Sequence, residues 1–155
     1  MNDLIKLAAF TGCRIEELCS LKIKNVLGDR LVIENAKSQA GNRIVPIHSE
    51  IKQLITRLFY TSVDGFLLSN LSFNKYGDRS NAIGKRFGRM KAKLGYDDRY
   101  VFHSIRKMFT SQLEAAGVPE AVAARLPTLS YGLYSSGTTF EVLKNAIERV
   151  KYPNH

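Results

Sequence analysis

The sequence predicts a mainly helical α+β domain with a small antiparallel β-sheet, and three observations lead to this fold class. Apolar residues recur at helical spacing along most of the chain, one segment between residues 31 and 47 has strand-like runs around a glycine-containing turn, and neither repeats nor low-complexity stretches occur. A chain of 155 residues also has enough apolar material for one buried core. We therefore expect residues 1–155 to form one domain.

Two helices separated by a corner are expected at the start of the chain. Residues 4–10 are apolar at helical spacing and end at Thr11-Gly12, and a second helical face follows at Ile15, Leu18 and Leu21. No capping residue precedes the first helix, which suggests that the sequence starts inside or just upstream of an element. We therefore expect a further domain upstream.

A β-hairpin and another helix are predicted next. Leu31-Val-Ile and Arg43-Ile-Val-Pro-Ile form two short strands joined by a turn that contains Gly41, and Lys37 lies close to this turn. The spacing of an amphipathic helix then occurs at Ile51, Leu54, Ile55 and Leu58. Residues 65–68 predict a short extended piece.

The C-terminal half is predicted to be mostly helical. The expected helices are residues 78–94, residues 102–116 with Gly117 at the C-cap, a short helix from Pro119 to near Leu126, and an amphipathic helix over residues 140–150. Residues 127–137, with two tyrosines and two glycines, are expected to be a loop.

The charge of the chain favours a polyanionic partner. The sequence has 23 Lys and Arg against 14 Asp and Glu, which gives a formal net charge of +9, and nucleic acid is the leading partner class. The helix over residues 78–94 carries a basic run, in which Lys85, Arg86 and Arg89 are the candidate DNA contacts, with Lys91 and Lys93 after them. The alternative is a solvated helix face.

Several other classes of site are not expected. Cys13 and Cys19 point roughly 240° apart on a helix, so they cannot bridge each other, and a reducing compartment fits. The three histidines are isolated from one another and from both cysteines, so no metal site is predicted. Neither a membrane span nor a leader is apparent, and we expect a soluble cytoplasmic protein without membrane contact.

Two arginines are the candidate phosphate ligands. Arg14 follows a helix break, where a long side chain can project into a cleft, and its planar fork matches two phosphate oxygens. The alternative for Arg14 is a structural salt bridge to Glu17, and Glu17 could also hold the guanidinium in place for binding. Arg106 shares a helix face with His103 at i, i+3, an arrangement that is most often an ordinary surface or core pair.

The motifs TGCRIEEL, AKSQAGNRIVPI, HSIRK and SYGLYSSG together resemble the catalytic domain of the tyrosine recombinases, or phage integrases, most closely those of bacterial prophages. The resemblance extends from about Leu4 to Tyr152. It implies site-specific DNA recombination on double-stranded DNA, by cleavage and rejoining through a 3′-phosphotyrosyl link, with no metal or other cofactor. It also implies a separate N-terminal core-DNA-binding domain and a nucleoid-associated bacterial protein.

The resemblance assigns roles to individual residues. Arg14 and Arg106 correspond to the pair that binds the non-bridging oxygens of the scissile phosphate, with Glu17 as a supporting residue. Lys37 corresponds to the hairpin lysine that protonates the departing 5′-oxygen; without the family pattern a solvated turn lysine would be preferred. His103 corresponds to the histidine that transfers a proton to or from the nucleophile and contacts the phosphate.

The nucleophile implied by the resemblance is a tyrosine after Arg106. Tyr134 fits the spacing best, and Tyr131 is the alternative. A phenol has an ordinary pKa near 10, so either tyrosine needs a neighbouring base and a cationic pocket. The family works as a tetramer on two duplexes, and the resemblance suggests that the helix over residues 140–150 docks on a neighbouring subunit. Packing on its own core is the alternative, and the isolated domain is expected to be a monomer.

One departure from the family pattern concerns the residues before the nucleophile. The family has a Leu-Gly-His motif there, whereas here Leu126 is followed directly by Pro127. We expect the missing residues to belong to the protein and to be skipped in the sequence, because a real deletion would pull the tyrosine loop from the phosphate and impair cleavage. Type IB topoisomerase-like strand relaxation and a DNA-binding module without catalysis are the alternative functions.

Overall fold

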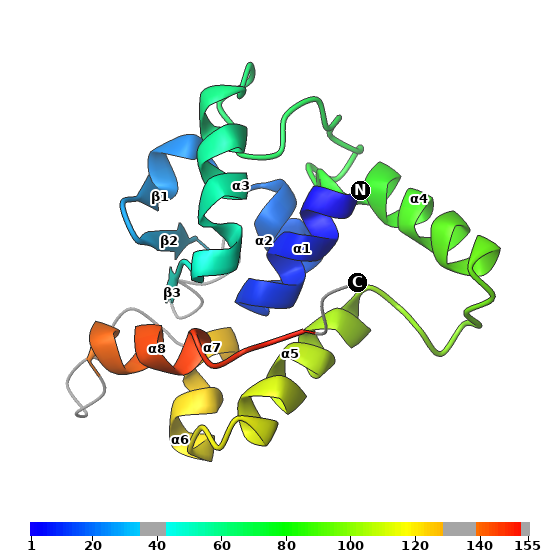
Figure 1. Cartoon of the computed structure of the whole chain (residues 1–155). Coiled ribbons are helices and arrows are strands. Elements are labelled where there is room, and N and C mark those ends of the chain that lie inside the picture. The colour runs from blue at the N-terminus through cyan, green and yellow to red at the C-terminus, as the bar shows by residue number, and fades with distance from the viewer. Residues whose placement is uncertain (35–42, 129–138, 153–155) are drawn as a thin grey trace.

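The computed structural model describes residues 1–34, 43–128 and 139–152, and in this part of the chain the predicted α+β fold class is confirmed (Figure 1). The helices are α1 (Asn2–Thr11), α2 (Ile15–Cys19), α3 (Ser49–Tyr60), α4 (Ser80–Lys93), α5 (His103–Ala115), α6 (Glu120–Ala123), α7 (Arg125–Thr128) and α8 (Phe140–Ile147), with a 3₁₀ turn at Ile23–Asn25. The strands are β1 (Val26–Leu27), β2 (Arg30–Ile33) and β3 (Arg43–Pro46).

The small sheet contains the predicted hairpin and one strand that was not predicted. β2 pairs antiparallel with β3, with Leu31 opposite Val45 and Ile33 opposite Arg43, and β1 adds a third antiparallel strand on the other side of β2. β1 has two residues, too few for an alternating pattern to appear in the sequence. Of the extended piece predicted over residues 65–68, only Phe66 pairs, through an isolated β-bridge to Lys22, and Leu67 and Leu68 lie in bends.

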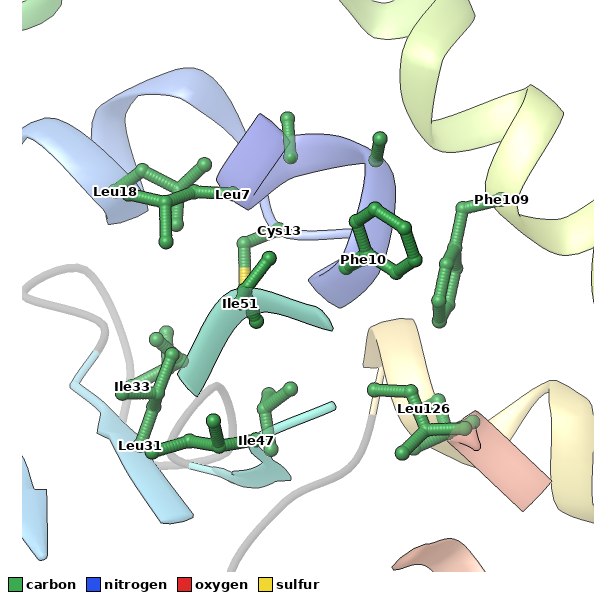
Figure 2. Packing of buried hydrophobic residues seen from close by; sticks show 14 of the residues in the cluster. Leu7, Phe10, Cys13, Leu18, Leu31, Ile33, Ile47, Ile51, Phe109 and Leu126 are labelled. Atoms are coloured by element: carbon green, nitrogen blue, oxygen red, sulfur yellow. The ribbon is translucent and has the colours of Figure 1, made fainter. Parts of the chain in front are cut away.

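The first helix lies in the middle of the fold. α1 packs against α2, α3 and α5, so it contacts both the half with the sheet and the half with the C-terminal helices (Figure 1). Figure 2 shows Cys13 and Ile51 between Leu7 and Leu18 on one side and the residues of β2 on the other. One apolar core therefore holds the corner after α1 in a fixed place.

The last helix, α8, packs on its own domain. In the described residues, α8 contacts β3 and α6, Lys144 forms a 3.0 Å ion pair with Asp29, and the guanidinium of Arg30 lies 3.9 Å from the ring centroid of Phe140. In the single chain α8 therefore packs on its own core, and docking of this helix on a neighbouring subunit stays a prediction. α8 also ends at Ile147, three residues before the predicted end.

Two expectations about the region before the tyrosine loop were wrong. The full sequence of 155 residues runs directly from Leu126 to Pro127, so no residues are skipped between them and the Leu-Gly-His motif is absent. The single helix expected from Pro119 to near Leu126 is instead two short helices, α6 and α7, and α7 ends two residues later at Thr128. Proline is tolerated there because its position lies in the first turn of a helix, where its missing N–H costs no intrahelical bond.

Candidate active site

The corner between α1 and α2 is built from a glycine and a threonine. Gly12 has φ +63° and ends α1, with its N–H donating to the carbonyl of Ala8. A Cβ at this position would lie 2.5 Å from Cδ1 of Phe109, so only glycine fits. The hydroxyl of Thr11 donates to the carbonyl of Leu7 and accepts the N–H of Cys13. The chain therefore turns sharply and delivers Arg14 at a defined position.

Arg14 is the N-cap of α2 and forms the salt bridge expected as its alternative role. Its backbone N–H donates to Oε2 of Glu17 at 2.7 Å, and its Nη1 donates to Oε1 at 3.0 Å. The side chain of Arg14 is nevertheless 53% exposed. Glu17 thus orients the guanidinium while leaving much of it open to a ligand.

A second arginine, Arg43 at the start of β3, holds Glu17 from the other side. Its Nη2 and Nη1 donate to the two carboxylate oxygens of Glu17 at 2.6 and 2.8 Å, and its side chain is 2% exposed. Burial would raise the pKa of Glu17, but the hydrogen bonds and charge of Arg43, followed by Arg14, lower it to about 2. The carboxylate is therefore charged at neutral pH.

The role of Arg43 was not predicted from the sequence. A signal exists in the strand period, because Arg43 and Val45 share one face of β3 and both are buried. A buried arginine needs an acidic partner. That partner lies 26 positions earlier in the sequence, and no local pattern connects the two.

Arg106 reaches the same corner from α5. Its Nη1 donates to the carbonyl oxygen of Gly12 at 2.8 Å, and the residue is 8% exposed. Burial, then the charge of Arg14 and then that of Arg43 lower its pKa, although a guanidinium remains charged. The structure therefore brings Arg14 and Arg106 to one corner, where Glu17 pairs with Arg14 and Arg43 and Arg106 is held by the carbonyl of Gly12.

His103 is the first residue of α5 and is exposed. It lies one turn before Arg106, and residues three apart share a helix face. The remaining candidates, Lys37, Tyr131 and Tyr134, lie outside the described residues. The structure thus assembles the arginines, Glu17 and the helix that carries His103.

The candidate DNA contacts lie on α4. Lys85, Arg86 and Arg89 are exposed, and their i, i+3 and i+4 spacing places them along one side of the helix. The one fully buried residue of this helix is Ile83. α4 therefore presents basic side chains to solvent, which fits both DNA contact and the alternative of a solvated helix face.

The described residues offer neither a metal site nor a reactive thiol nor a membrane-spanning helix. No group of three or more His, Cys, Asp or Glu side chains that could hold a metal is present among them. Cys13 and Cys19 are free and buried, and burial raises the pKa of both thiols, that of Cys19 to about 12. Among the described helices, none has the length and apolar character to cross a membrane.

Comparison with known proteins identifies the family. The model of the phage integrase family matches residues 2–127, most of the chain. The chain belongs to the phage integrase family. The match ends at Pro127, where the Leu-Gly-His motif is missing. No curated protein matches the chain.

Solved integrases share the fold. The integrase from mycobacterium phage Brujita is 18% identical, with a TM-score of 0.74 over 97% of this chain and 51% of that one. The Tn1549 transposon integrase in complex with circular intermediate DNA is 21% identical, with a TM-score of 0.64 over 96% and 59%. The lambda integrase catalytic core is 17% identical, with a TM-score of 0.63 over 83% and 82%. The chain spans about half the length of the Brujita integrase.

Proposed function

We propose that this phage integrase family member catalyses site-specific recombination by cutting and rejoining DNA strands through a phosphotyrosyl intermediate. The observation that carries the proposal is the contact of Arg106 with the carbonyl of Gly12, two residues before Arg14. It places two guanidinium groups at one corner. Glu17 pairs with Arg14 and Arg43, so one carboxylate balances two guanidinium groups, and Arg106 adds a third positive charge to the corner, which favours binding of an anion.

The proposed chemistry uses these charges in the transition state. The phenol oxygen of Tyr134 attacks the scissile phosphorus, and the phosphorus–O5′ bond breaks. Arg14 and Arg106 neutralise the charge that develops on the non-bridging oxygens, which is where electrostatic stabilisation contributes most. His103 takes the proton of Tyr134, and Lys37 gives a proton to the departing 5′-oxygen. The reverse reaction with another strand's 5′-hydroxyl completes the exchange.

The proposed substrate is double-stranded DNA, contacted by the exposed Lys85, Arg86 and Arg89. Support comes from the net charge of +9 and from related folds, since the Tn1549 integrase has been solved with circular intermediate DNA and a lambda integrase dimer has been solved on a COC′ core site. We propose a tetramer on two duplexes as the working assembly, a separate N-terminal domain that binds core DNA, and a cytoplasmic, nucleoid-associated location.

The test is a nicked half-site DNA that traps the covalent adduct. We expect an adduct that Tyr134→Phe abolishes and Tyr131→Phe preserves. Because the Leu-Gly-His motif is absent, we expect a slow reaction, so long incubations and denaturing gels are needed. Loss of the adduct in Tyr131→Phe instead would move the nucleophile to that residue.

Two other outcomes would replace the proposed function. Salt-sensitive DNA binding with no adduct, even after long incubation, would leave a DNA-binding module without catalysis. Relaxation of supercoiled DNA, with rejoining of the original strand and no exchange between two labelled duplexes, would indicate type IB topoisomerase-like activity.

A further inference from the structure

The basic helix α4 begins without a cap of its own. Arg79, which precedes it, has helical backbone angles of φ −92° and ψ −17°, its side chain caps no amide, and no acidic residue lies in the first turn. The N–H groups at the start of a helix need acceptors, and the helix dipole favours a negative charge there. The acceptor for α4 must come from elsewhere in the fold.

Glu16 of α2 supplies that acceptor. Its Oε2 accepts the backbone N–H of Ser80 at 2.8 Å, and its Oε1 accepts that of Arg79 at 3.1 Å. The hydroxyl of Ser20 also donates to Oε1. Burial would raise the pKa of Glu16, but the hydrogen bonds from Ser20, Ser80 and Arg79 lower it overall, so the carboxylate that caps the helix is charged.

The side chain of Arg79 anchors the segment that enters α4. Its guanidinium lies 3.5 Å from the ring centroid of Phe66 and 5.3 Å from that of Phe73. Its Nη2 donates to the carbonyl of Leu68 at 2.9 Å and to the carboxylate of Asp64 at 3.2 Å, and the residue is 2% exposed. The amide that Glu16 binds therefore belongs to a firmly held residue.

Consecutive residues of α2 serve both the arginine corner and α4. Ile15 packs on α4, where its Cδ1 lies 3.7 Å from the position of a Cβ on Gly84. Glu16 caps α4, and Glu17 holds Arg14. One short helix thus fixes the phosphate-binding corner and the DNA-contacting helix relative to each other.

We infer that Glu16 is a positioning residue, which sets the orientation of the basic side of α4 relative to Arg14. This inference rests on the proposed function. α4 has 14 residues and is about 20 Å long, so a tilt of about 10° at Ser80 would move Arg89 by roughly 2 Å. A misplacement of about 1 Å can cost a reaction about 10²-fold. DNA bound by α4 would then be displaced from its correct position at Arg14.

A distance measurement tests the geometry without DNA. Spin labels at Lys6→Cys on α1 and Lys93→Cys at the end of α4 report the position of α4 by pulsed electron paramagnetic resonance, since the two native thiols are buried. We expect Glu16→Ala to broaden the distance distribution or shift its mean by about 3 Å. Glu50→Ala removes an exposed acid from the first turn of α3 and should change nothing. An unchanged distribution in Glu16→Ala would overturn the inference.

Adduct formation tests the consequence for the reaction. At saturating half-site DNA, we expect Glu16→Ala to slow adduct formation by about tenfold or more while DNA affinity changes less than about threefold. Glu16→Gln keeps one acceptor oxygen and should recover part of the rate. A wild-type rate in Glu16→Ala contradicts the inference. If the native chain forms no adduct, the proposed function fails, and the distance measurement still decides whether Glu16 holds α4.

Discussion

Arg106 of α5 donates a 2.8 Å hydrogen bond to the carbonyl oxygen of Gly12, across 94 positions of sequence. The bond joins the helix that carries His103 to the corner that carries Arg14. Because Gly12 has φ +63°, its carbonyl points in a direction that other residues rarely allow. The proposed phosphate site therefore depends on a backbone conformation as well as on its charges.

Arg106→Lys should reduce adduct formation by about 10²–10³-fold, because lysine carries the charge but cannot bind Gly12 and a phosphate oxygen with one planar fork. The measurement is the rate of adduct formation on a nicked half-site at saturating DNA. Lys107→Ala is the control, since it removes an exposed positive charge at the next position of α5. A rate in Arg106→Lys close to that of the native chain would contradict the proposed role of the planar fork.

Gly12→Ala should lower the free energy of unfolding by about 3 kcal/mol or more. The new Cβ would clash with the ring of Phe109, and alanine would be strained at φ +63°. Gly28→Ala is a matched control, since Gly28 has φ +62° but no atom within 4 Å of a Cβ, and it should cost only about 1 kcal/mol. Urea unfolding followed by circular dichroism gives both values. Equal costs would mean that the contact with Phe109 contributes nothing.

Elements with a local pattern in the sequence were predicted, whereas contacts between residues far apart in the sequence were not. Helical periodicity predicted α1, α3 and α5, and the glycine turn predicted the pairing of β2 with β3, because each signal repeats within a few residues. Arg43 and Glu17 are different. Their ion pair spans 26 positions, and each residue alone resembles an ordinary surface charge.

His48 is another residue whose partner lies too far along the sequence to be predicted. The sequence presents it as an isolated histidine, but its Nδ1 accepts the N–H of Glu50 at the start of α3, and its Nε2 lies 3.0 Å from the carbonyl of Val150. A backbone N–H can only donate, so Nε2 carries the hydrogen. The partner at Val150 is 102 positions away, and only the folded chain reveals it.

The stability of the domain should fall in acid in a way that depends on Glu17. In the folded protein the pKa of Glu17 is about 2, below its ordinary value of 4.5. Its carboxylate therefore contributes fully to the free energy of unfolding above pH 4.5, and this contribution is lost as the pH falls through 2. Glu17→Gln should therefore cost about 3 kcal/mol near neutral pH, and this difference should shrink toward pH 2. Urea unfolding across this range measures it.

Glu114→Gln provides the control for this pH series. Glu114 is exposed on α5, so its substitution removes the same charge without touching Arg43. We expect little change in stability at any pH. A difference between the native chain and Glu17→Gln that stays constant down to pH 2 would mean that the carboxylate charge does not stabilise the fold.

The C-terminal segment should stabilise the domain that contains it. The hydroxyl of Tyr152 donates to the carbonyl of Ala9 at 2.8 Å, and its ring lies edge-on to Phe10 with centroids 5.1 Å apart. Tyr152→Phe should cost about 1 kcal/mol and Tyr152→Ala about 3 kcal/mol. Tyr60→Phe, at a residue that is 81% exposed, should cost nothing measurable.

Thermal unfolding at two protein concentrations shows whether the Tyr152 that contacts Ala9 belongs to the same chain or to a neighbouring copy. Because Tyr152 and Ala9 belong to the same chain, the bond forms within a monomer, and the unfolding midpoint should not change over a hundredfold range of concentration. If the segment came from a neighbouring copy, mass action would raise the midpoint with concentration. Such a rise, lost in Tyr152→Ala, would contradict the intramolecular packing and support docking on a neighbour in the absence of DNA.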